Sequence, residues 1–77
     1  MYYQYRILEE VLFHPDIGTY LTFGIQCYLQ NPEKLVAALS DISTDKAFVQ
    51  NLAQKFTDGQ LYPIHLLDVI EDALLMV

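Results

Sequence analysis

The stretch that decides the fold class of this chain is Ser43–Val77, STDKAFVQNLAQKFTDGQLYPIHLLDVIEDALLMV. Its apolar residues recur at helical spacing, and the pattern is interrupted once, at Asp58-Gly59. The residues before Asn31 instead alternate between apolar and polar, as half-buried β-strands do. This change of period predicts a small α+β domain in which the strands come first and the helices last.

Two helices are predicted in the C-terminal half. The first runs from about Thr44 to Thr57, with Ser43 or Thr44 as its N-cap and Gly59 as the C′ residue that closes it. The second begins at Pro63, in the favoured first position of a helix, and runs towards Met76. The residues predicted to be buried are Phe48, Val49, Leu52, Ala53 and Phe56 in the first helix and Leu66, Leu67, Ile70, Ala73 and Leu74 in the second.

The N-terminal half is predicted to form a β-hairpin from residues 2–13 and 19–30. The segment between them, His14–Gly18, is rich in turn residues. If Phe13 faces Thr19, paired residue numbers sum to 32 and one face of the hairpin becomes almost wholly apolar. Glu9 opposite Phe23 is the one misfit, and a β-bulge at Glu9-Glu10 is expected to turn it outward.

Residues 31–42 support two interpretations. Asn31-Pro32-Glu33 has the composition of a helix start, with Asn as N-cap and Pro at the first helical position. The same residues also suit a turn followed by a third strand from Leu35 to Ile42.

Length, charge and cysteine content limit the class of protein. Seventy-seven residues allow one domain, residues 1–77. The net charge of −6, with only four scattered basic residues, argues against nucleic acid and against anionic membrane surfaces as partners. Cys27 is the only cysteine, so no internal disulfide can form, and the N-terminus has no signal-peptide pattern. No apolar stretch is long enough to span a bilayer, and we therefore expect a cytoplasmic protein.

Three segments resemble a known family. They are Gly18-Thr19-Tyr20 leading to Gly24-Ile25, then Asp41–Lys46 (DISTDK), and then Pro63–Asp72 (PIHLLDVIED). Over nearly the whole chain the sequence resembles a group of short uncharacterised, mainly clostridial bacterial proteins that are classed as a domain of unknown function. The resemblance implies no activity, but it implies a strand before Asp41. The predicted fold is therefore a two-layer α+β domain, with a three-stranded antiparallel β-meander and two C-terminal helices packed on one face (β-β-β-α-α).

The candidates for chemistry are few. His65, Asp68 and Asp72 stand at i, i+3 and i+7 and offer one face of a helix to a divalent metal, although a solvated acidic face explains the same pattern. Cys27 is a nucleophile only if His14 or His65 serves as its base, and the predicted register instead buries it. We expect no enzyme and no cofactor. The alternative function that the helix face supports is binding of a metal or small ligand.

The second face of the sheet carries the main functional expectation. Two short helices can cover only one side of a three-stranded sheet, which leaves the other side open. That side carries Tyr2, Leu8, Leu12, Tyr20 and Tyr28. Tyrosine and leucine with few charges suit a protein–protein contact, including a symmetric dimer. The sequence thus predicts a non-catalytic interaction or accessory module whose partner is another protein or a second copy.

Overall fold

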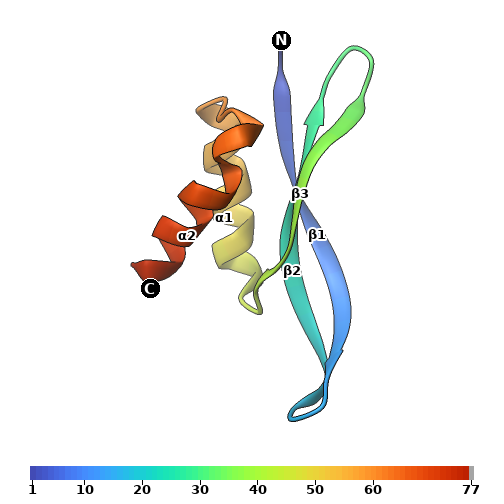
Figure 1. Ribbon diagram of the computed structural model, residues 1–77. Coiled ribbons are helices and arrows are strands. Elements are labelled where there is room, and N and C mark those ends of the chain that lie inside the picture. Colours follow the sequence, from blue (N-terminus) through green and yellow to red (C-terminus); the bar gives the residue numbers. More distant parts are fainter. Residues whose placement is uncertain (77) are drawn as a thin grey trace.

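A computed structural model of the protein describes residues 1–76 and shows three strands followed by helices (Figure 1). The elements are β1 (Tyr3–His14), β2 (Gly18–Leu29), β3 (Lys34–Ser43), α1 (Lys46–Asp58), the 3₁₀ turn η1 (Pro63–His65) and α2 (Leu66–Leu75). The strands form one antiparallel sheet in the order β1-β2-β3, and the helices lie on one side of it (Figure 1). The α+β meander is confirmed. The predicted domain range includes Val77, which lies outside the described residues.

The register predicted for the hairpin is confirmed. Tyr3 pairs with Leu29, Phe13 pairs with Thr19, and every pair between them keeps the sum of 32. The bulge predicted at Glu9-Glu10 is wrong, because Glu9 pairs directly with Phe23 without a shift in register. Glu9 stays on the helix-bearing face and is exposed there. It needs no bulge to reach water, because the helix layer ends at this level of the hairpin.

Residues 34–43 form a strand and not a helix, and the strand is irregular. It leaves the ladder after Leu39, which pairs with Ile25, and rejoins it at Ser43, which pairs with Phe23. Between these points Asp41 adopts φ 52°, in the left-handed region. The loop of β3 passes so close to Gly24 that a Cβ there would lie 2.3 Å from the Leu39 carbonyl oxygen. Only glycine fits at this crossing.

The segment of β3 between Leu39 and Ser43 forms a β-bulge, and a polar network holds it in place. The Glu10 carboxylate accepts hydrogen bonds from the Ser40 hydroxyl at 2.7 and 2.8 Å and from the Asp41 amide at 3.1 Å. The Asp41 carboxylate accepts in turn from the hydroxyl of Thr22 at 2.8 Å and from that of Tyr20 at 2.9 Å. Thr22 is fully buried as a result.

Both ends of α1 differ by a residue or two from expectation. The N-cap is Asp45, whose Oδ1 accepts from the Phe48 amide at 3.2 Å, whereas Ser43 accepts from the Asp45 amide at 3.1 Å. At the C-terminal end Gly59 stays right-handed at φ −86°, and Gln60 takes the left-handed position at φ 50°. The Gln60 side chain provides the reason, because its amide pairs with both backbone groups of Tyr3 at 2.9 Å.

The second helix starts as a 3₁₀ turn and buries a narrower stripe than predicted. Leu66 and Ile70 are buried and Ala73 packs against the core, whereas Leu67 and Leu74 are exposed. This correction follows from the position of α2, which contacts β3, the edge strand of the sheet. A helix in that position presents one side to the core and its flanks to water.

The core occupies only part of the sheet. Its buried members are Tyr5, Phe23, Ile25, Cys27, Ile42, Val49, Leu52, Ala53, Phe56, Leu66 and Ile70. The 13 residues of α1 span about 20 Å, whereas the 12 residues of β1 extend for about 40 Å. The longest dimension of the molecule, 42 Å, accords with the strand and not with the helix. The helices therefore cover the hairpin from its open end to the Glu9–Phe23 pair and leave the rest uncovered.

Candidate functional site

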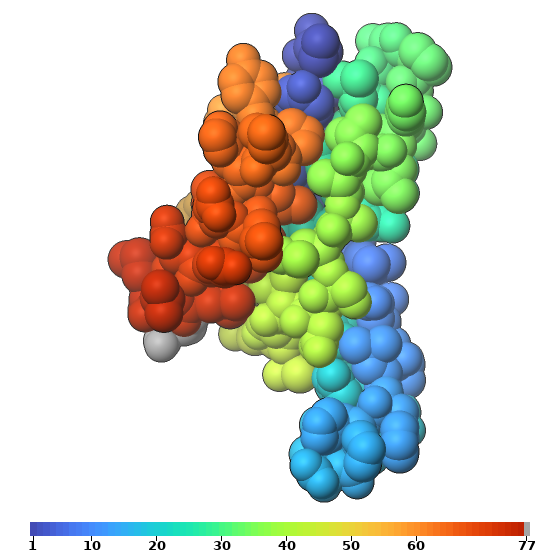
Figure 2. All heavy atoms as spheres, in the orientation of Figure 1, coloured from blue at the N-terminus to red at the C-terminus, as the bar shows by residue number. Residues whose placement is uncertain are grey.

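The part of the hairpin beyond the helices, residues 11–21, is here called the hairpin arm. It projects clear of the rest of the molecule, as the light blue spheres in Figure 2 show. Val11 and Phe13 are 67% and 72% exposed, and Leu21 is 46% exposed. These three side chains occupy the face that is buried elsewhere in the hairpin. The predicted apolar face is therefore real, but its distal part has no cover within the described residues.

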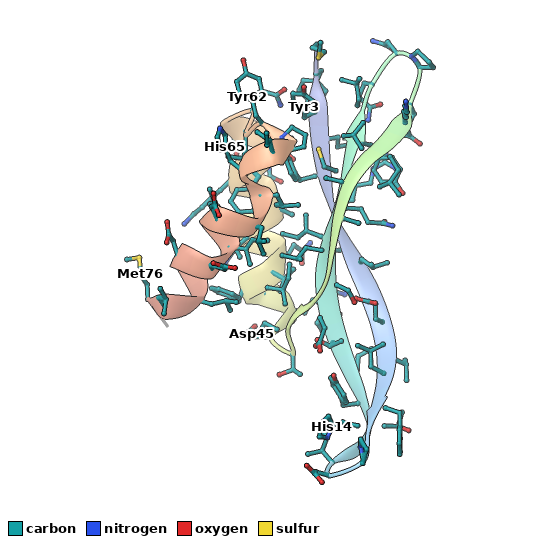
Figure 3. The ribbon with its side chains drawn as sticks, in the orientation of Figure 1. Tyr3, His14, Asp45, Tyr62, His65 and Met76 are labelled. Carbon is teal, nitrogen blue, oxygen red and sulfur yellow. The ribbon has the colours of Figure 1, made fainter. Side chains whose placement is uncertain are left out.

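The arm is also nearly free of charge. Asp16 is its only acidic residue, and His14 is the only other side chain able to carry a charge. His14 ends β1 and Asp16 lies in the turn, where its amide donates to His14 Nδ1 at 3.1 Å. Figure 3 shows His14 at the extreme end of the molecule. Ile17 in the same turn is exposed. The arm thus presents apolar side chains and a polar turn, in a protein whose net charge is −6.

The tyrosine-bearing face lies opposite the helices, as predicted, and its members differ in exposure. Tyr2 is exposed, whereas Leu8, Leu12, Tyr20 and Tyr28 are all half-buried.

Two of the tyrosines have partners within the chain. Tyr20 donates to Asp41, and this hydrogen bond raises the pKa of the Tyr20 phenol. Tyr28 lies beneath the guanidinium of Arg6, 4.3 Å from the ring centroid, and Arg6 also pairs with Glu33. Tyr20 and Tyr28 thus hold their own sheet together. The structure does not test whether this face also binds a partner.

The three residues predicted as candidate metal ligands are all exposed to solvent. His65 ends η1, Asp68 and Asp72 lie on α2, and all three are exposed. Among residues 1–76 no three histidine, cysteine, aspartate or glutamate side chains gather as a metal-binding group. The geometry therefore provides no observation in favour of a metal site over a solvated acidic helix face.

Cys27 is fully buried in the core, beneath the helices. Burial raises the pKa of its thiol, so little of the reactive thiolate exists at neutral pH. The histidines that could serve as its base lie at different ends of the molecule, His14 in the hairpin turn and His65 before α2 (Figure 3). Cys27 acts here as a small apolar core residue.

The structure also has an open hollow of about 420 Å³, lined by Met1, Tyr3, Gln60 and Tyr62. The rings of Tyr3 and Tyr62 meet edge to face at 6.1 Å (Figure 3), and the Gln60 amide is already bonded to the Tyr3 backbone. Within residues 1–76 no acidic, histidine or cysteine side chain lines this hollow.

Sequence reasoning missed the arm, although the signal for it was present. Strands of 12 residues and a helix of 13 residues differ about twofold in length. Comparing these lengths would have shown that Val11, Phe13 and Leu21 lie beyond the reach of the helices.

The features assembled so far define a small α+β domain with one uncovered apolar arm and no assembled catalytic group in its described part. The chain belongs to a family of unknown function, DUF6514, whose model matches residues 1–76. No match was found among curated proteins or among solved structures. Within residues 1–76 none of the helices has the length and apolar character needed to cross a membrane.

Proposed function

We propose that this protein is a small, non-catalytic interaction module of the cytoplasm, and that the hairpin arm is its contact surface. The observation that carries the proposal is the exposure of Val11, Phe13 and Leu21 on a projecting, nearly uncharged part of the sheet. Together with Ile17 these side chains present on the order of 500 Å² of apolar surface, within the range at which patches on monomers are often functional.

The interior of the domain supports a role in binding over one in catalysis. The one thiol, Cys27, is buried and has a raised pKa. The acidic side chains Glu10 and Asp41 are engaged in holding the bulge of β3. The single cysteine supports the cytoplasmic assignment, because disulfides are rare in reducing compartments.

The proposal is tested by comparing arm and control variants for binding to any protein, including the chain itself. Phe13→Ser and Val11→Ser alter the arm, and Ile64→Ser alters a side chain that is 84% exposed elsewhere. Wild type and Ile64→Ser should bind the same partner, and the arm variants should lose it while keeping the circular dichroism of the fold. If neither self-association nor binding of another protein depends on the arm, the proposal is wrong.

A further inference from the structure

Along the outer edge of β1, the backbone groups near the open end of the hairpin have hydrogen-bond partners, and those along the arm have none within residues 1–76. The Tyr3 amide donates to Gln60 Oε1 and the Tyr5 amide donates to Thr57 Oγ1, both at 2.9 Å and both on the side away from β2. The pairing of β1 with β2 is unbroken, so every second residue after Tyr5 directs its backbone groups the same way. Glu9, Val11 and Phe13 therefore point their N–H and C=O groups outward.

No hydrogen bond within residues 1–76 meets these outward groups. The last turn of α1 and Gln60 close the edge near the open end of the hairpin, and nothing comparable closes it along the arm. An edge strand of this kind is a template for pairing with another strand. The open edge and the uncovered apolar face belong to the same residues, Val11 and Phe13.

We propose that the arm pairs with the arm of a second copy, through antiparallel hydrogen bonding between the two β1 edges. This inference rests on the proposed function and names its partner. In a two-fold arrangement Val11 faces Val11 of the second copy, and Glu9 faces Phe13. The sheet then continues from one copy into the other, and the two apolar faces become neighbours.

Charge favours a second copy as the occupant. Two chains of net charge −6 repel each other over most of their surfaces, and the arm is where that repulsion is least. A basic partner would gain little here, because Asp16 is the only acid of the arm and the paired segment adds only Glu9 on the same face. The partner that fits is a strand edge with an apolar face and few charges, and β1 of a second copy presents such an edge.

Edge pairing also brings apolar side chains together across the interface. A strand added at an edge continues the sheet, so it buries the backbone edge and the facing flanks of Val11 and Phe13 and leaves the two faces of the arm open. Val11 and Phe13 are 67% and 72% exposed in the single chain, so each has apolar surface to place against the second copy. The dimer is therefore expected to be held mainly by backbone hydrogen bonds.

The first test is molar mass by light scattering over a wide range of protein concentration, with three variants. Wild type is expected to approach twice the chain mass of 8.9 kDa. Val11→Pro removes an outward N–H and leaves the bonds between β1 and β2 in place. Val11→Lys sets two cations against each other on the two-fold axis. Both should weaken the dimer by about tenfold or more, which is 1.4 kcal/mol or more, and Ile64→Ser should not weaken it.

The second test distinguishes edge pairing from any other contact. Amide hydrogen exchange should slow with concentration at Glu9, Val11 and Phe13, whose amides point outward. It should stay constant at Leu12, whose amide is bonded to β2 throughout. Rapid exchange of the outward amides in a proven dimer would overturn the edge pairing.

The outcomes separate the inference from the proposed function. A wild type that is monomeric at every concentration overturns the second copy as partner, and arm-dependent binding of a different protein would then leave the interaction module standing. A dimer that neither Val11 variant weakens also overturns the inference, and Tyr28→Glu then tests the tyrosine-bearing face as the interface.

Discussion

The crossing of β3 over Gly24 leads to a sharp prediction about stability. In Gly24→Ala the new Cβ would lie 2.3 Å from the Leu39 carbonyl oxygen and 3.1 Å from the Ser40 Cα. Both neighbours are backbone atoms, so no side-chain rotation relieves the overlap. To restore an ordinary contact of 3.4 Å, β3 must retreat by about 1 Å at this point.

That retreat breaks the network that holds the bulge. The bonds from Ser40 to Glu10 and from Thr22 to Asp41 are 2.7–2.8 Å long, and a further 1 Å takes them beyond hydrogen-bonding distance. The Thr22 hydroxyl is fully buried and keeps the Ser43 carbonyl, at 3.2 Å, as a second acceptor; loss of its bond to the charged Asp41 carboxylate costs about 1–3 kcal/mol. With the overlap itself, we expect Gly24→Ala to lower the free energy of unfolding by about 3 kcal/mol.

The assay is urea and thermal unfolding followed by circular dichroism. A loss of about 3 kcal/mol corresponds to a fall in Tm of roughly 12–24 °C in a domain of this size. The other two glycines are matched controls. Gly59→Ala places its Cβ 3.3 Å from the Lys55 oxygen at an ordinary φ and should change stability by less than about 1 kcal/mol. Gly18→Ala meets nothing within 4 Å but stands at φ 79°, and should cost about 1–2 kcal/mol through the backbone alone. If Gly24→Ala is no worse than Gly18→Ala, the close crossing of β3 is wrong.

Three further predictions use the same unfolding assays. Asp45→Ala should lower the free energy of unfolding by about 1 kcal/mol because it removes the N-cap of α1. Thr44→Ala should lower it by less than half as much, and equal losses of stability would contradict the assignment of the cap. Gln60→Ala should cost about 1–3 kcal/mol through its lost bonds to Tyr3, and Gln60→Gly should recover about 1 kcal/mol of that because glycine tolerates φ 50°. Burial, with the Cys27 thiol beside it, raises the pKa of Tyr5 above its ordinary value of 10.0. As the pH rises, the unfolded chain therefore loses the Tyr5 phenol proton before the folded chain does. The stability that Tyr5 contributes is complete below pH 10 and is lost as the pH rises above it. Tyr5→Phe should flatten the fall in Tm above pH 10, and an unchanged slope would refute the assignment.

The register of the hairpin was predictable because each side chain of a strand can lie on only one of two faces of the sheet. A shift of one residue would mix the two faces, and the turn at His14–Gly18 sets where pairing starts. The third strand needed the family resemblance, because Asn31-Pro32-Glu33 satisfies a helix start and a turn equally well. Local chemistry alone settled the two strands of the hairpin and both helices, and the resemblance settled the third strand.

The errors arose where a contact distant in sequence decides the outcome. Gly59 is the natural residue for a left-handed position, yet Gln60 occupies it because its side chain reaches Tyr3, 57 residues away. The bulge was expected at Glu9-Glu10 and lies instead in β3, where Glu10 holds Asp41. Leu67 and Leu74 satisfy the helical period, but how much of α2 the core covers depends on where the helix lies, which the period does not specify.

The choice of residues along the hairpin provides an internal control for the function of the arm. On the face opposite the helices, near the open end of the hairpin, Gln4, Arg6 and Gln26 occupy positions that water reaches. At the arm the corresponding uncovered positions on the helix-bearing face hold Val11, Phe13 and Leu21. Strand propensity does not require this, because threonine is also a good strand former and Thr19 fills one such position in the same arm. The face opposite the helices thus mixes these polar residues with Leu8 and Tyr28, whereas the helix-bearing face of the arm is mainly apolar. An apolar majority on side chains that are 46–72% exposed accords with a surface that meets a partner.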